Sequence, residues 1–515
     1  MQHQHYRSHK AGHLSMAYIG QLVQLSGWVK SIRRYRKIAF IELRESSGFV
    51  QLVVSPSLIT TLTIESSIQI KGLVQMRQSP HPRLHEYPTG EIEVQVQTLQ
   101  ILNKASALPF QEHEHPSDEE MLKHRALALR WKKHQNPLIL RSKMIKAMRC
   151  VLEEKEFIEV ETPVLVRNTP GGANPFLVSA GEENYYALAQ SPQTWKQLLV
   201  CGGIERYYQL AHCFRNEGAK PERQPEFSQF EIEMAFTTAS EVQEIMEECV
   251  VQGAKALGIE LVAFPKLSYQ VCLEEFGSDK PHLGNPLRLK SVTLEKGVEV
   301  QLPLPESVEL KHLEIISNVW NHIQMKAPLS IQWIPFEQKT KVLRAKGPYG
   351  ETHLWMGRVL KEVAEQCQWI EKGFFPLWVE AFPLFEKGEQ GWEAVHHPFT
   401  RPKQVEGIET PLYKAQSEAF DLVLNGVEVG GGSMRIHEEA LQKEVFKWLN
   451  LSEEHFESLL SMLAWGAPPH GGMALGVERL LSILIGAGSI REVMAFPKTV
   501  KGQCLLTKAP SKLET

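Results

Sequence analysis

The chain has 515 residues, of which 23% are charged, and its formal net charge is -4. This length accommodates about three or four domains, and the small negative charge argues against a nonspecific coat for nucleic acid, although it allows a local basic patch. No run of about 18 apolar residues occurs, so we expect neither a transmembrane helix nor a membrane partner.

Seven cysteines are scattered along the chain and none forms a CxxC pair. The odd count and the irregular spacing indicate free thiols in a reducing compartment, and argue against a disulfide framework or a zinc site. The first residues, Met1 to Ala11, are rich in His and Gln and match neither a secretory signal nor an Arg/Ser-rich transit peptide. We therefore expect a cytoplasmic protein, with the mitochondrial matrix as the alternative.

Residues 1–103 predict a small β domain. Apolar side chains alternate with polar ones in several short segments separated by Gly, Ser and Pro, as at Ala39, Ile41 and Leu43, and again at Ile92, Val94 and Val96. About five such strands are typical of a closed Greek-key barrel of the OB type.

One segment of this domain, Arg33 to Lys37, combines four basic residues with Tyr35. Such a segment attracts phosphates and offers a ring on which a base can stack. Taken alone, however, the segment favours a solvated hairpin tip.

The rest of the chain predicts an interrupted α+β domain. Residues 104–135 lack periodicity and indicate a linker or hinge. Residues 136–279 mix helices and strands, beginning with an amphipathic helix after Pro137. Residues 280–388 carry no catalytic pattern but have strand and helix patterns of their own, so we interpret them as an inserted α+β domain. Residues 389–515 return to Gly-rich strands and helices.

Two strands joined by a long charged loop are predicted between Tyr207 and Phe236. On the second strand, Phe227, Gln229, Glu231 and Glu233 share one face. Two carboxylates two residues apart repel each other unless a cation or an amine lies between them. Arg215 at the end of the first strand could bind a phosphate or carboxylate in a bidentate way, and Phe227 could stack on a base.

A hairpin is predicted around Asn425-Gly426, a pair typical of a type I′ turn. A two-residue turn pairs Val423 with Glu428 and places Asp421 and Glu428 on one face, where two oxygen donors suit Mg²⁺ that carries substrate phosphates. Gly430, Gly431 and Gly432 follow, and three glycines in a strand indicate close approach by a ligand or another backbone. The plainer alternative is a β-bulge with surface acids.

Two further signals are weak when taken alone. Gly476 precedes an apolar helical run with Arg479 in its first turn, which is a possible phosphate site at a helix N-terminus. Lys196 follows Ser191-Pro192, a pair that starts a helix. Lys196 could neutralise an acidic substrate, but by itself it favours a solvated helical lysine.

Together these segments resemble the motifs of class II aminoacyl-tRNA synthetases, and nearly the whole chain takes part. The helix ending at Glu161-Thr-Pro163 resembles motif 1, Phe214 to Phe227 resembles motif 2, and Gly476 to Arg479 resembles motif 3. Within the class, further segments resemble the aspartyl enzymes of bacterial and mitochondrial type: Gln190 to Lys196, Phe276 to Pro281, His396 to Thr400, Gly430 to His437 and Ile490 to Lys498.

The resemblance implies aspartate activation with ATP and Mg²⁺, followed by transfer to tRNA(Asp). Arg215, Glu428 and Arg479 would be the catalytic residues, with Arg215 on the α-phosphate and the substrate carboxylate, and Arg479 on the γ-phosphate. Asp421 and Glu428 would hold the metal. The implied ATP-binding residues are Arg215, Asn216, Glu217, Gln224, Phe227, Glu428, Gly476, Val477, Glu478 and Arg479.

The implied aspartate-binding residues are Gln193, Lys196, Arg215, Glu231, His396 and Arg435. Lys196 and Arg435 would clasp the aspartate side chain, and beside asparagine both cations would stay buried and unpaired, a penalty of typically a few kcal/mol. In the OB-like domain Arg33, Phe40 and Gln51 match positions that read the anticodon. Pro163 matches a position at a homodimer interface.

Several departures from the family's pattern leave alternatives open. Gly171 stands where Glu is frequent, Glu231 stands for Asp, Asn216 stands for Asp, and the inserted segment is shorter and more divergent than in the bacterial enzymes. One alternative is a nondiscriminating enzyme that also charges tRNA(Asn). Lys196 with Arg435 opposes an asparaginyl enzyme. The other alternative is a noncatalytic paralogue, which Arg215, Glu428 and Arg479 oppose together.

Overall fold

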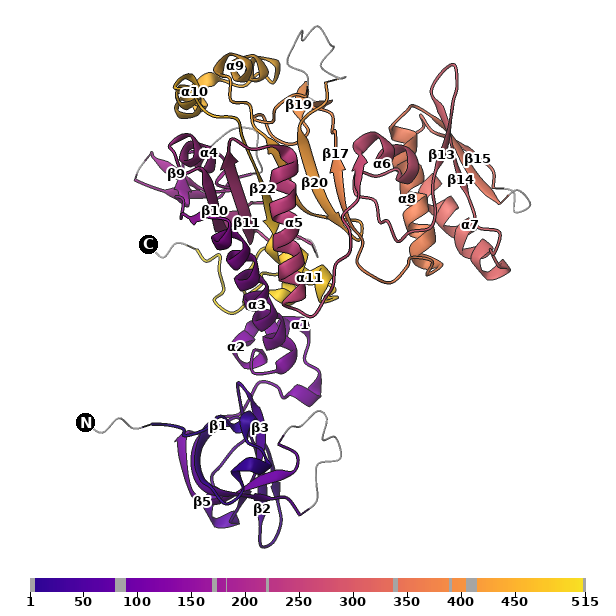
Figure 1. The fold of residues 1–515 in the computed structure, drawn as a ribbon. Coiled ribbons are helices and arrows are strands. Elements are labelled where there is room, and N and C mark those ends of the chain that lie inside the picture. Colours follow the sequence, from indigo (N-terminus) through magenta and orange to yellow (C-terminus); the bar gives the residue numbers. More distant parts are fainter. Residues whose placement is uncertain are drawn as a thin grey trace. The chain divides into compact units, whose positions relative to one another are not determined.

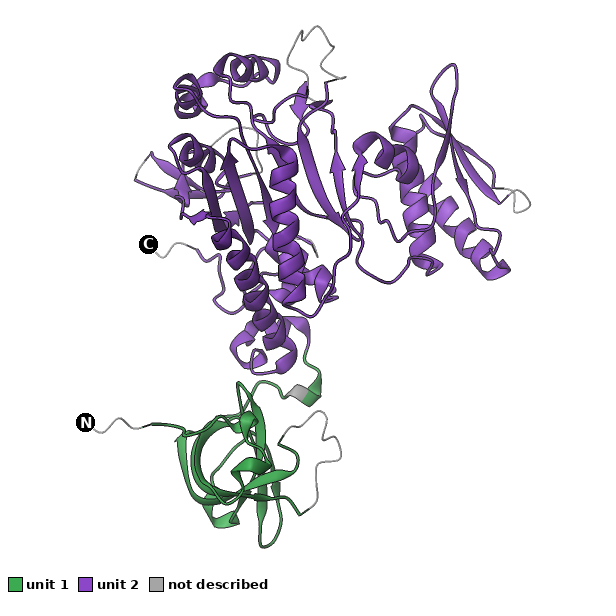
Figure 2. Cartoon of the chain, in the orientation of Figure 1, with its two compact units in different colours: residues 1–116 green, residues 117–515 purple. Residues whose placement is uncertain are grey.

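The computed structural model describes residues 5–78, 89–168, 174–181, 183–218, 222–336, 341–388, 391–403 and 415–512. The chain divides into two compact units, residues 1–116 and 117–515 (Figure 2). In the described part of the chain, no helix is both long and apolar enough to cross a membrane.

The first unit contains a closed five-stranded barrel in the order β1-β2-β3-β5-β4. Its buried side chains are those of the alternating positions, such as Ile41, Leu43 and Val94, so the prediction of an OB-type barrel is confirmed. The strands are β1 Leu22–Arg34, β2 Ala39–Glu45, β3 Gly48–Val54, β4 Ser67–Met76 and β5 Ile92–Asn103. Short 3-10 helices flank them: η1 Ala11–His13, η2 Met16–Tyr18, η3 Pro56–Ile59 and η5 Glu112–Glu114.

The second unit is built on an eight-stranded sheet in the order β12-β17-β20-β21-β22-β11-β10-β6 (Figure 1). The six central strands are antiparallel, and only the edge strands pair in parallel. The strands are β6 Ile158–Glu159, β10 Arg206–Phe214, β11 Glu226–Ala235, β12 Lys266–Ser268, β17 Pro376–Glu380, β20 Ala419–Leu424, β21 Val427–Met434 and β22 His470–Gly476.

Helices α3 (Lys132–Glu154), α5 (Ala239–Lys255) and α11 (Val477–Leu484) cover one face of this sheet with a continuous apolar core (Figure 1). The core side chains of β11, Phe230 and Ile232, point to this face, which leaves Gln229, Glu231 and Glu233 on the opposite face. The packed and the chemical faces of β11 are therefore the ones that the alternation predicts.

The helix expected after Pro137 begins earlier, at Lys132, so Pro137 lies inside α3. Proline lacks the N–H that would bond to the carbonyl four residues back. Pro137 is the sixth residue of α3, beyond the first four positions whose N–H groups have no intrahelical partner, so the carbonyl of Lys133 lacks its usual bond. Two short helices precede α3 in the segment expected as linker: α1 Asp118–Lys123 and α2 Arg125–Ala128.

The segment interpreted as an insertion has its own four-stranded sheet, in the order β13-β14-β16-β15, and its own core. Gly277, the left-handed C-cap of α6, lies against Gly357 of α8 so closely that a Cβ on either glycine would collide with the backbone of the other. The elements are α6 Tyr269–Phe276, β13 Lys290–Thr293, β14 Val298–Pro303, α7 Leu310–Gln324, β15 Gln332–Ile334, β16 Val342–Gly347 and α8 Glu351–Gln366.

The remaining elements lie around the large sheet. Helix α4 begins at Gln193, directly after the Ser191-Pro192 pair, as predicted. The other elements are β7 Leu165–Val166, β8 Leu177–Ser179, β9 Tyr185–Leu188, α4 Gln193–Cys201, β18 Phe385–Lys387, β19 Trp392–Ala394, α9 Glu439–Trp448, η7 Glu453–His455, α10 Glu457–Ala464 and η8 Ile490–Val493.

Candidate active site

The β20–β21 hairpin presents two carboxylates on the exposed face of the sheet. Asn425 and Gly426 have φ of 51° and 78°, which is the type I′ turn predicted from the sequence. Val423 pairs with Glu428 as expected, but the register then shifts, so that Leu422 pairs with Gly430. The hairpin therefore has both a bulge and a carboxylate pair, and Asp421 is only 5% exposed, which excludes the expectation of surface acids.

The three glycines of β21 serve two purposes. A Cβ on Gly430 or Gly432 would collide with the backbone of β22, at Ala474 and Gly472 respectively. A Cβ on Gly431 would lie 2.6 Å from Oδ1 of Asp421. Two glycines thus allow close approach of a neighbouring backbone, and the middle one keeps the space beside a carboxylate open.

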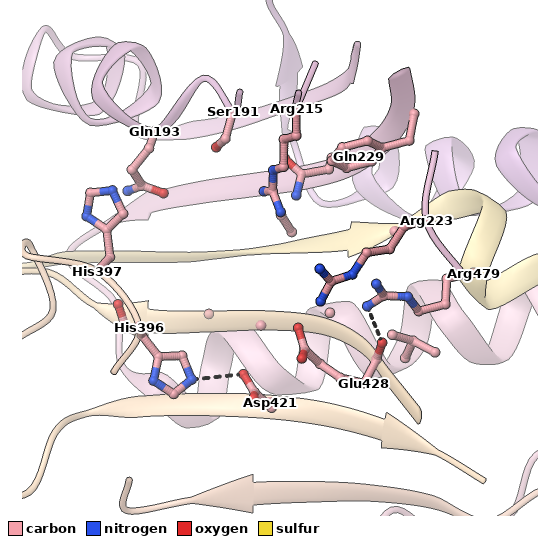
Figure 3. A pocket seen from close by; sticks show the side chains of 18 of the residues that line it. Ser191, Gln193, Arg215, Arg223, Gln229, His396, His397, Asp421, Glu428 and Arg479 are labelled. Atoms are coloured by element: carbon pink, nitrogen blue, oxygen red, sulfur yellow. Dashed lines mark hydrogen bonds and ion pairs between the residues drawn. The ribbon is translucent and has the colours of Figure 1, made fainter. Parts of the chain in front are cut away.

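A cavity of about 500 Å³ lies over the central strands of the sheet (Figure 3). Arg215 enters it from β10, Asp421 and Glu428 from the hairpin, and Arg479 from α11 (Figure 3). The residues implied by the resemblance that line it are Gln193, Lys196, Arg215, Glu217, Gln224, Phe227, His396, Asp421, Glu428, Arg435, Gly476, Glu478 and Arg479.

Three implied site residues do not reach the cavity wall. Val477 is buried in the apolar core, because the first turn of α11 turns that side chain toward the packed face. Asn216 is exposed outside the cavity, and Glu231 is fully buried. Gly171 lies outside the described residues, as does Lys220 of the charged loop.

Lys196 is 1% exposed, so the interpretation of it as a solvated helical lysine is wrong. Its Nζ lies 3.5 Å from Oε2 of Glu231 and 3.2 Å from Oε2 of Glu233. Arg435 donates to both oxygens of Glu233, at 2.8 and 3.1 Å. A cation does lie between the two acids, as their spacing on β11 requires. The expectation that Lys196 and Arg435 lack partners beside an uncharged ligand is also wrong, because Glu231 and Glu233 already pair with them.

The two acids of this cluster differ in their affinity for a proton. Burial raises the pKa of Glu231, and the nearby Lys196 only partly offsets this effect. Burial also acts to raise the pKa of Glu233, but Arg435 and Lys196 together lower it to about 2. Glu233 is therefore the permanent counter-charge of Arg435, and Glu231 is the acid that protonates more readily.

His396 pairs with Asp421, one member of the carboxylate pair. His396 Nε2 lies 3.1 Å from Oδ1 of Asp421, as the dashed line in Figure 3 marks. Burial raises the pKa of Asp421. Burial acts in the same direction on Glu428, but the Lys280 ammonium, 2.9 Å from its Oε2, and Arg479 together lower the pKa of Glu428. The carboxylate that faces Lys280 is thus the more readily ionised of the two.

The N-terminus of α11 supplies positive charge on the other side of Glu428. Arg479 Nη1 donates to the backbone oxygen of Glu428 at 2.7 Å (Figure 3). Among described residues, no carboxylate lies within ion-pair distance of Arg479 or Arg215. The Arg215 guanidinium instead lies 5.1 Å from the ring centre of Phe227. Two arginines facing one cavity without an acidic partner fit an anionic ligand.

Neighbouring side chains hold the motif-like segments in place. The Glu478 carboxylate accepts from the backbone N–H of Ser228 at 3.0 Å and from Arg141 at 3.2 Å, which ties α11 to β11 and α3. The Gln224 side chain accepts from the backbone N–H of Lys498 at 2.8 Å. Glu478 and Gln224 thus position the cavity wall as well as lining it.

Two polar atoms at the cavity have no hydrogen-bond partner in the described part of the chain. They are Nε2 of Gln193 and Nδ1 of His396. Gln193 Nε2 is a donor that fits an oxygen of a polar ligand, whereas Nδ1 of a neutral His396, whose Nε2 donates to Asp421, is an acceptor that fits a ligand N–H or O–H. The cavity therefore offers a positively charged region at Arg215 and Arg479 and a polar region beside Lys196 and Arg435.

A second candidate surface lies in the barrel unit. Arg33, Phe40 and Gln51 come together there, since Arg33 pairs with Phe40 across the strands and donates to Oε1 of Gln51 at 2.9 Å. Arg77 donates to the same oxygen at 2.8 Å, and Gln51 donates to Glu93 at 2.8 Å. The basic run from Arg33 to Lys37 forms the exposed tip of the β1–β2 hairpin, which agrees with the simpler local interpretation.

Some residues of the buried charged cluster and of the cavity have no role predicted from the sequence. Glu233, which is fully buried and does not line the cavity, is predicted only as one acid of a pair, and Lys280, which lines the cavity, only as part of the Phe276–Pro281 segment. His397 lines the cavity, and burial together with Arg435 and Lys196 lowers its pKa to about 3. The signal for Lys280 was its place in a family-like segment, because no periodicity relates it to Glu428.

Comparison with known proteins places these observations in a family. Residues 117–500 match the model of class II tRNA synthetases (D, K and N), and residues 23–102 match that of the OB-fold nucleic acid binding domain. The chain is 37% identical to an aspartate–tRNA(Asp/Asn) ligase of Dictyoglomus turgidum, covering 99% of this chain and 96% of that protein.

Solved structures share the fold at lower identity. The asparaginyl-tRNA synthetase of Pyrococcus horikoshii complexed with asparaginyl-adenylate aligns with a TM-score of 0.65 at 21% identity, covering 94% of this chain and 96% of that one. A putative aspartyl-tRNA synthetase of Leishmania major aligns with a TM-score of 0.65 at 19% identity, covering 96% and 94%. With both family models matched in the order of the two units, the chain belongs to the class II tRNA synthetases of the D, K and N group and carries their OB-fold domain at its N-terminal side.

Proposed function

We propose that this protein is an aspartate–tRNA ligase, which activates L-aspartate with ATP to aspartyl-adenylate and transfers the aspartyl group to the 3′ end of tRNA(Asp). One observation carries the proposal: a single cavity joins the arginines without acidic partners, Arg215 and Arg479, to the carboxylate pair and to the buried Lys196–Arg435 cluster. The 37% identity to an aspartate–tRNA(Asp/Asn) ligase over nearly the full chain supports it.

In the first step, an oxygen of the aspartate α-carboxylate attacks the α-phosphorus of ATP, and the bond to pyrophosphate breaks. In the second step, a hydroxyl of the terminal ribose attacks the acyl carbon, and AMP leaves. Such reactions depend mainly on positioning and charge neutralisation. Arg215 binds the α-phosphate and the reacting carboxylate, Phe227 stacks on adenine beside Glu217, and Arg479 binds the γ-phosphate.

The charge of the buried cluster accounts for a preference for aspartate. Arg435 pairs with both oxygens of Glu233, whereas Lys196 lies 3.2 Å from Glu233 and 3.5 Å from Glu231. Lys196 is thus the less closely paired of the two cations and can bind the side-chain carboxylate of aspartate. Asparagine would offer this ammonium no negative charge, which weakens its binding.

Asp421 and Glu428 are the residues that would hold Mg²⁺. Two carboxylates at one cavity fit a hard cation whose remaining ligands are waters and substrate phosphates, and the open space beside Gly431 leaves room for it. Bound there, the ion would neutralise negative charge on the phosphates.

The barrel supplies a surface for the anticodon. Arg33, Arg77 and Phe40 offer positive charge and an aromatic face around a fixed Gln51 amide, the combination that binds unpaired bases. A second candidate function, charging tRNA(Asn) as well, is favoured by the relative of Dictyoglomus turgidum, which is an aspartate–tRNA(Asp/Asn) ligase.

The assembly we propose is a homodimer. Pro163 is exposed beside the small β7-β9-β8 sheet, where Leu177 and Tyr185 share one face at 60% and 61% exposure and Leu165 lies on the other face at 48% exposure. Exposed apolar side chains of this kind are typical of an interface. The cytoplasmic location expected from the sequence stays a prediction.

ATP–pyrophosphate exchange tests the proposed activity. We expect exchange that depends on L-aspartate, with a much weaker response to L-asparagine. A chain without aspartate-dependent exchange would be the noncatalytic paralogue. Charging of purified tRNA(Asp) and tRNA(Asn) by the same protein then decides between the two tRNA specificities.

Arg479→Ala tests the γ-phosphate assignment. Because the Arg479 guanidinium faces the cavity at the start of α11, we expect exchange to fall by about 100-fold or more, which is the cost of a lost charge-assisted contact in the transition state, while the melting temperature changes little. Normal exchange in this variant would remove Arg479 from the ATP site.

A further inference from the structure

We propose that Lys280 is a further ATP-binding residue, which pairs with Glu428 when no nucleotide is bound and transfers to the β- and γ-phosphates when ATP and its metal ion enter. The inference rests on the proposed assignment of Asp421 and Glu428 to the metal. It adds a residue from outside the three family motifs, and this residue is carried by the loop that leads into the inserted segment.

The position of Lys280 is set by the fold. The loop after α6 packs on the β20–β21 turn, where a Cβ on Gly426 would lie 3.2 Å from Cβ of His282 and 3.7 Å from the backbone oxygen of Lys280. The backbone N–H of Lys280 donates to Oγ of Ser278 at 3.0 Å. The Gly277–Gly357 contact fastens the start of this loop to α8 of the inserted segment.

Two cations bracket Glu428 at the same end of the cavity. Lys280 Nζ lies 2.9 Å from its Oε2, and Arg479 Nη1 donates to its backbone oxygen at 2.7 Å. Lys280 lines the cavity and its side chain is 37% exposed, so it can change partner without leaving the site. Two convergent cations beside an acidic pair match the charge pattern of a metal-bound polyphosphate.

Lys280 and a divalent cation would compete for the Glu428 carboxylate. The Lys280 ammonium occupies the carboxylate oxygen that a divalent cation would need. When the cation takes that oxygen, the displaced ammonium keeps the Asp279 carboxylate, 3.5 Å from its Nζ, and gains the phosphates as new negative partners in the cavity. A purely structural lysine would instead keep Glu428 through the whole cycle.

The test uses Lys280→Met, which keeps the length of the side chain and removes its charge. The matched control is Lys266→Met, which breaks an exposed ion pair with Glu380 at 3.3 Å, away from the cavity. Binding of ATP, AMP, pyrophosphate and Mn²⁺ alone is measured by isothermal titration calorimetry on the full chain without aspartate, and Lys280→Arg is included as the variant that keeps the charge.

We expect Lys280→Met to weaken the binding of ATP and of pyrophosphate by about 10- to 100-fold, the range for a lost charge-assisted hydrogen bond. The affinity for AMP should stay within about twofold of the wild-type value. Mn²⁺ alone should bind more tightly, because the competing ammonium is gone. Lys280→Arg should retain most of the ATP affinity, and Lys266→Met should behave as the wild type.

The proposal would be overturned if Lys280→Met lost equal affinity for ATP and AMP, or lost no affinity for ATP. An unchanged affinity for Mn²⁺ alone would also overturn it. If the proposed function itself were wrong, the wild-type protein would show no aspartate-dependent exchange, whatever the result for Lys280→Met.

Discussion

At the scale of single residues, the site is organised by buried charge. Lys196, Arg435, Glu231 and Glu233 are all at most 5% exposed, so each ion must be compensated by another in the cluster. Sequence alternation placed the two acids on one face of a strand, but it could not name their counter-ions. The cations come from α4 and from the segment after β21, and only the folded chain brings them to β11.

Replacing Glu233 by Gln should destabilise the second unit by about 3–5 kcal/mol, because Arg435 and Lys196 would lose their permanent counter-charge in a buried site. Urea denaturation followed by circular dichroism measures the loss. Glu365→Gln, which breaks an exposed pair with Lys361, is the matched control and should cost about 0–1 kcal/mol. A Glu233→Gln protein as stable as this control would contradict a compensating role for Glu233.

His397 should make stability depend on pH. In the folded protein its pKa is about 3, below the ordinary value of 6.5, because burial and then the charges of Arg435 and Lys196 disfavour the imidazolium. Below pH 6.5 the unfolded chain therefore binds a proton that the folded chain refuses, so stability contributed by neutral His397 is lost as pH falls from 6.5 toward 3.

Calorimetric melting temperatures of the wild type and His397→Gln, measured between pH 7.5 and 5, test this linkage. The wild type should lose more stability than the variant as the pH falls. His455→Gln, at an exposed position, should follow the wild type. Parallel curves for wild type and His397→Gln would show that His397 is not held neutral by the fold.

At the scale of elements, glycines decide how closely the central strands approach. A Cβ on Gly472 of β22 would collide with Oε2 of Glu233 and with the backbone oxygen of Ile232. Gly472 therefore makes room for the Glu233–Arg435 ion pair, a use that the sequence pattern alone does not indicate. The alternating pattern of apolar and polar residues likewise does not predict the bulge in the β20–β21 hairpin.

Gly472→Ala should destabilise the second unit by roughly 1–3 kcal/mol, since the backbone contact cannot yield without shifting β11. It should also raise the KM for aspartate more than the KM for ATP, because Glu233 positions Arg435. Gly218→Ala, where an added Cβ meets nothing within 4 Å, is the control for stability. Equal stability of the two variants would contradict the role assigned to Gly472.

At the scale of the whole molecule, apolar surface predicts association. One face of the β7-β9-β8 sheet exposes Leu177 and Tyr185, an arrangement that a monomer in water disfavours. A twofold-symmetric pairing of identical surfaces would bury it.

Light scattering after size-exclusion chromatography should give a mass of roughly twice the 58.5 kDa of one chain. Leu177→Glu should shift the protein toward the monomer, because a charge would be buried in the interface. Leu329→Glu, at a fully exposed position of the inserted segment, should stay dimeric. A wild-type monomer at micromolar concentration would refute the proposed homodimer.

The sequence by itself determined the local elements and which of their faces carry chemistry. Alternation at positions such as Phe230 and Ile232 separates the packed face of β11 from its acidic face, and Asn425-Gly426 specifies the hairpin turn. These signals are local, because period, turn chemistry and capping depend on residues a few positions apart.

Only the tertiary structure decided which charges meet. Lys196 pairs with acids on another element, Lys280 reaches Glu428 across the whole inserted segment of the sequence, and Glu231 is withdrawn from the cavity that its position on the strand suggested. Partners of this kind are set by the packing of distant elements, and the free energy of a buried charge depends on those partners. The composition of the site was therefore predictable, whereas its electrostatic balance was not.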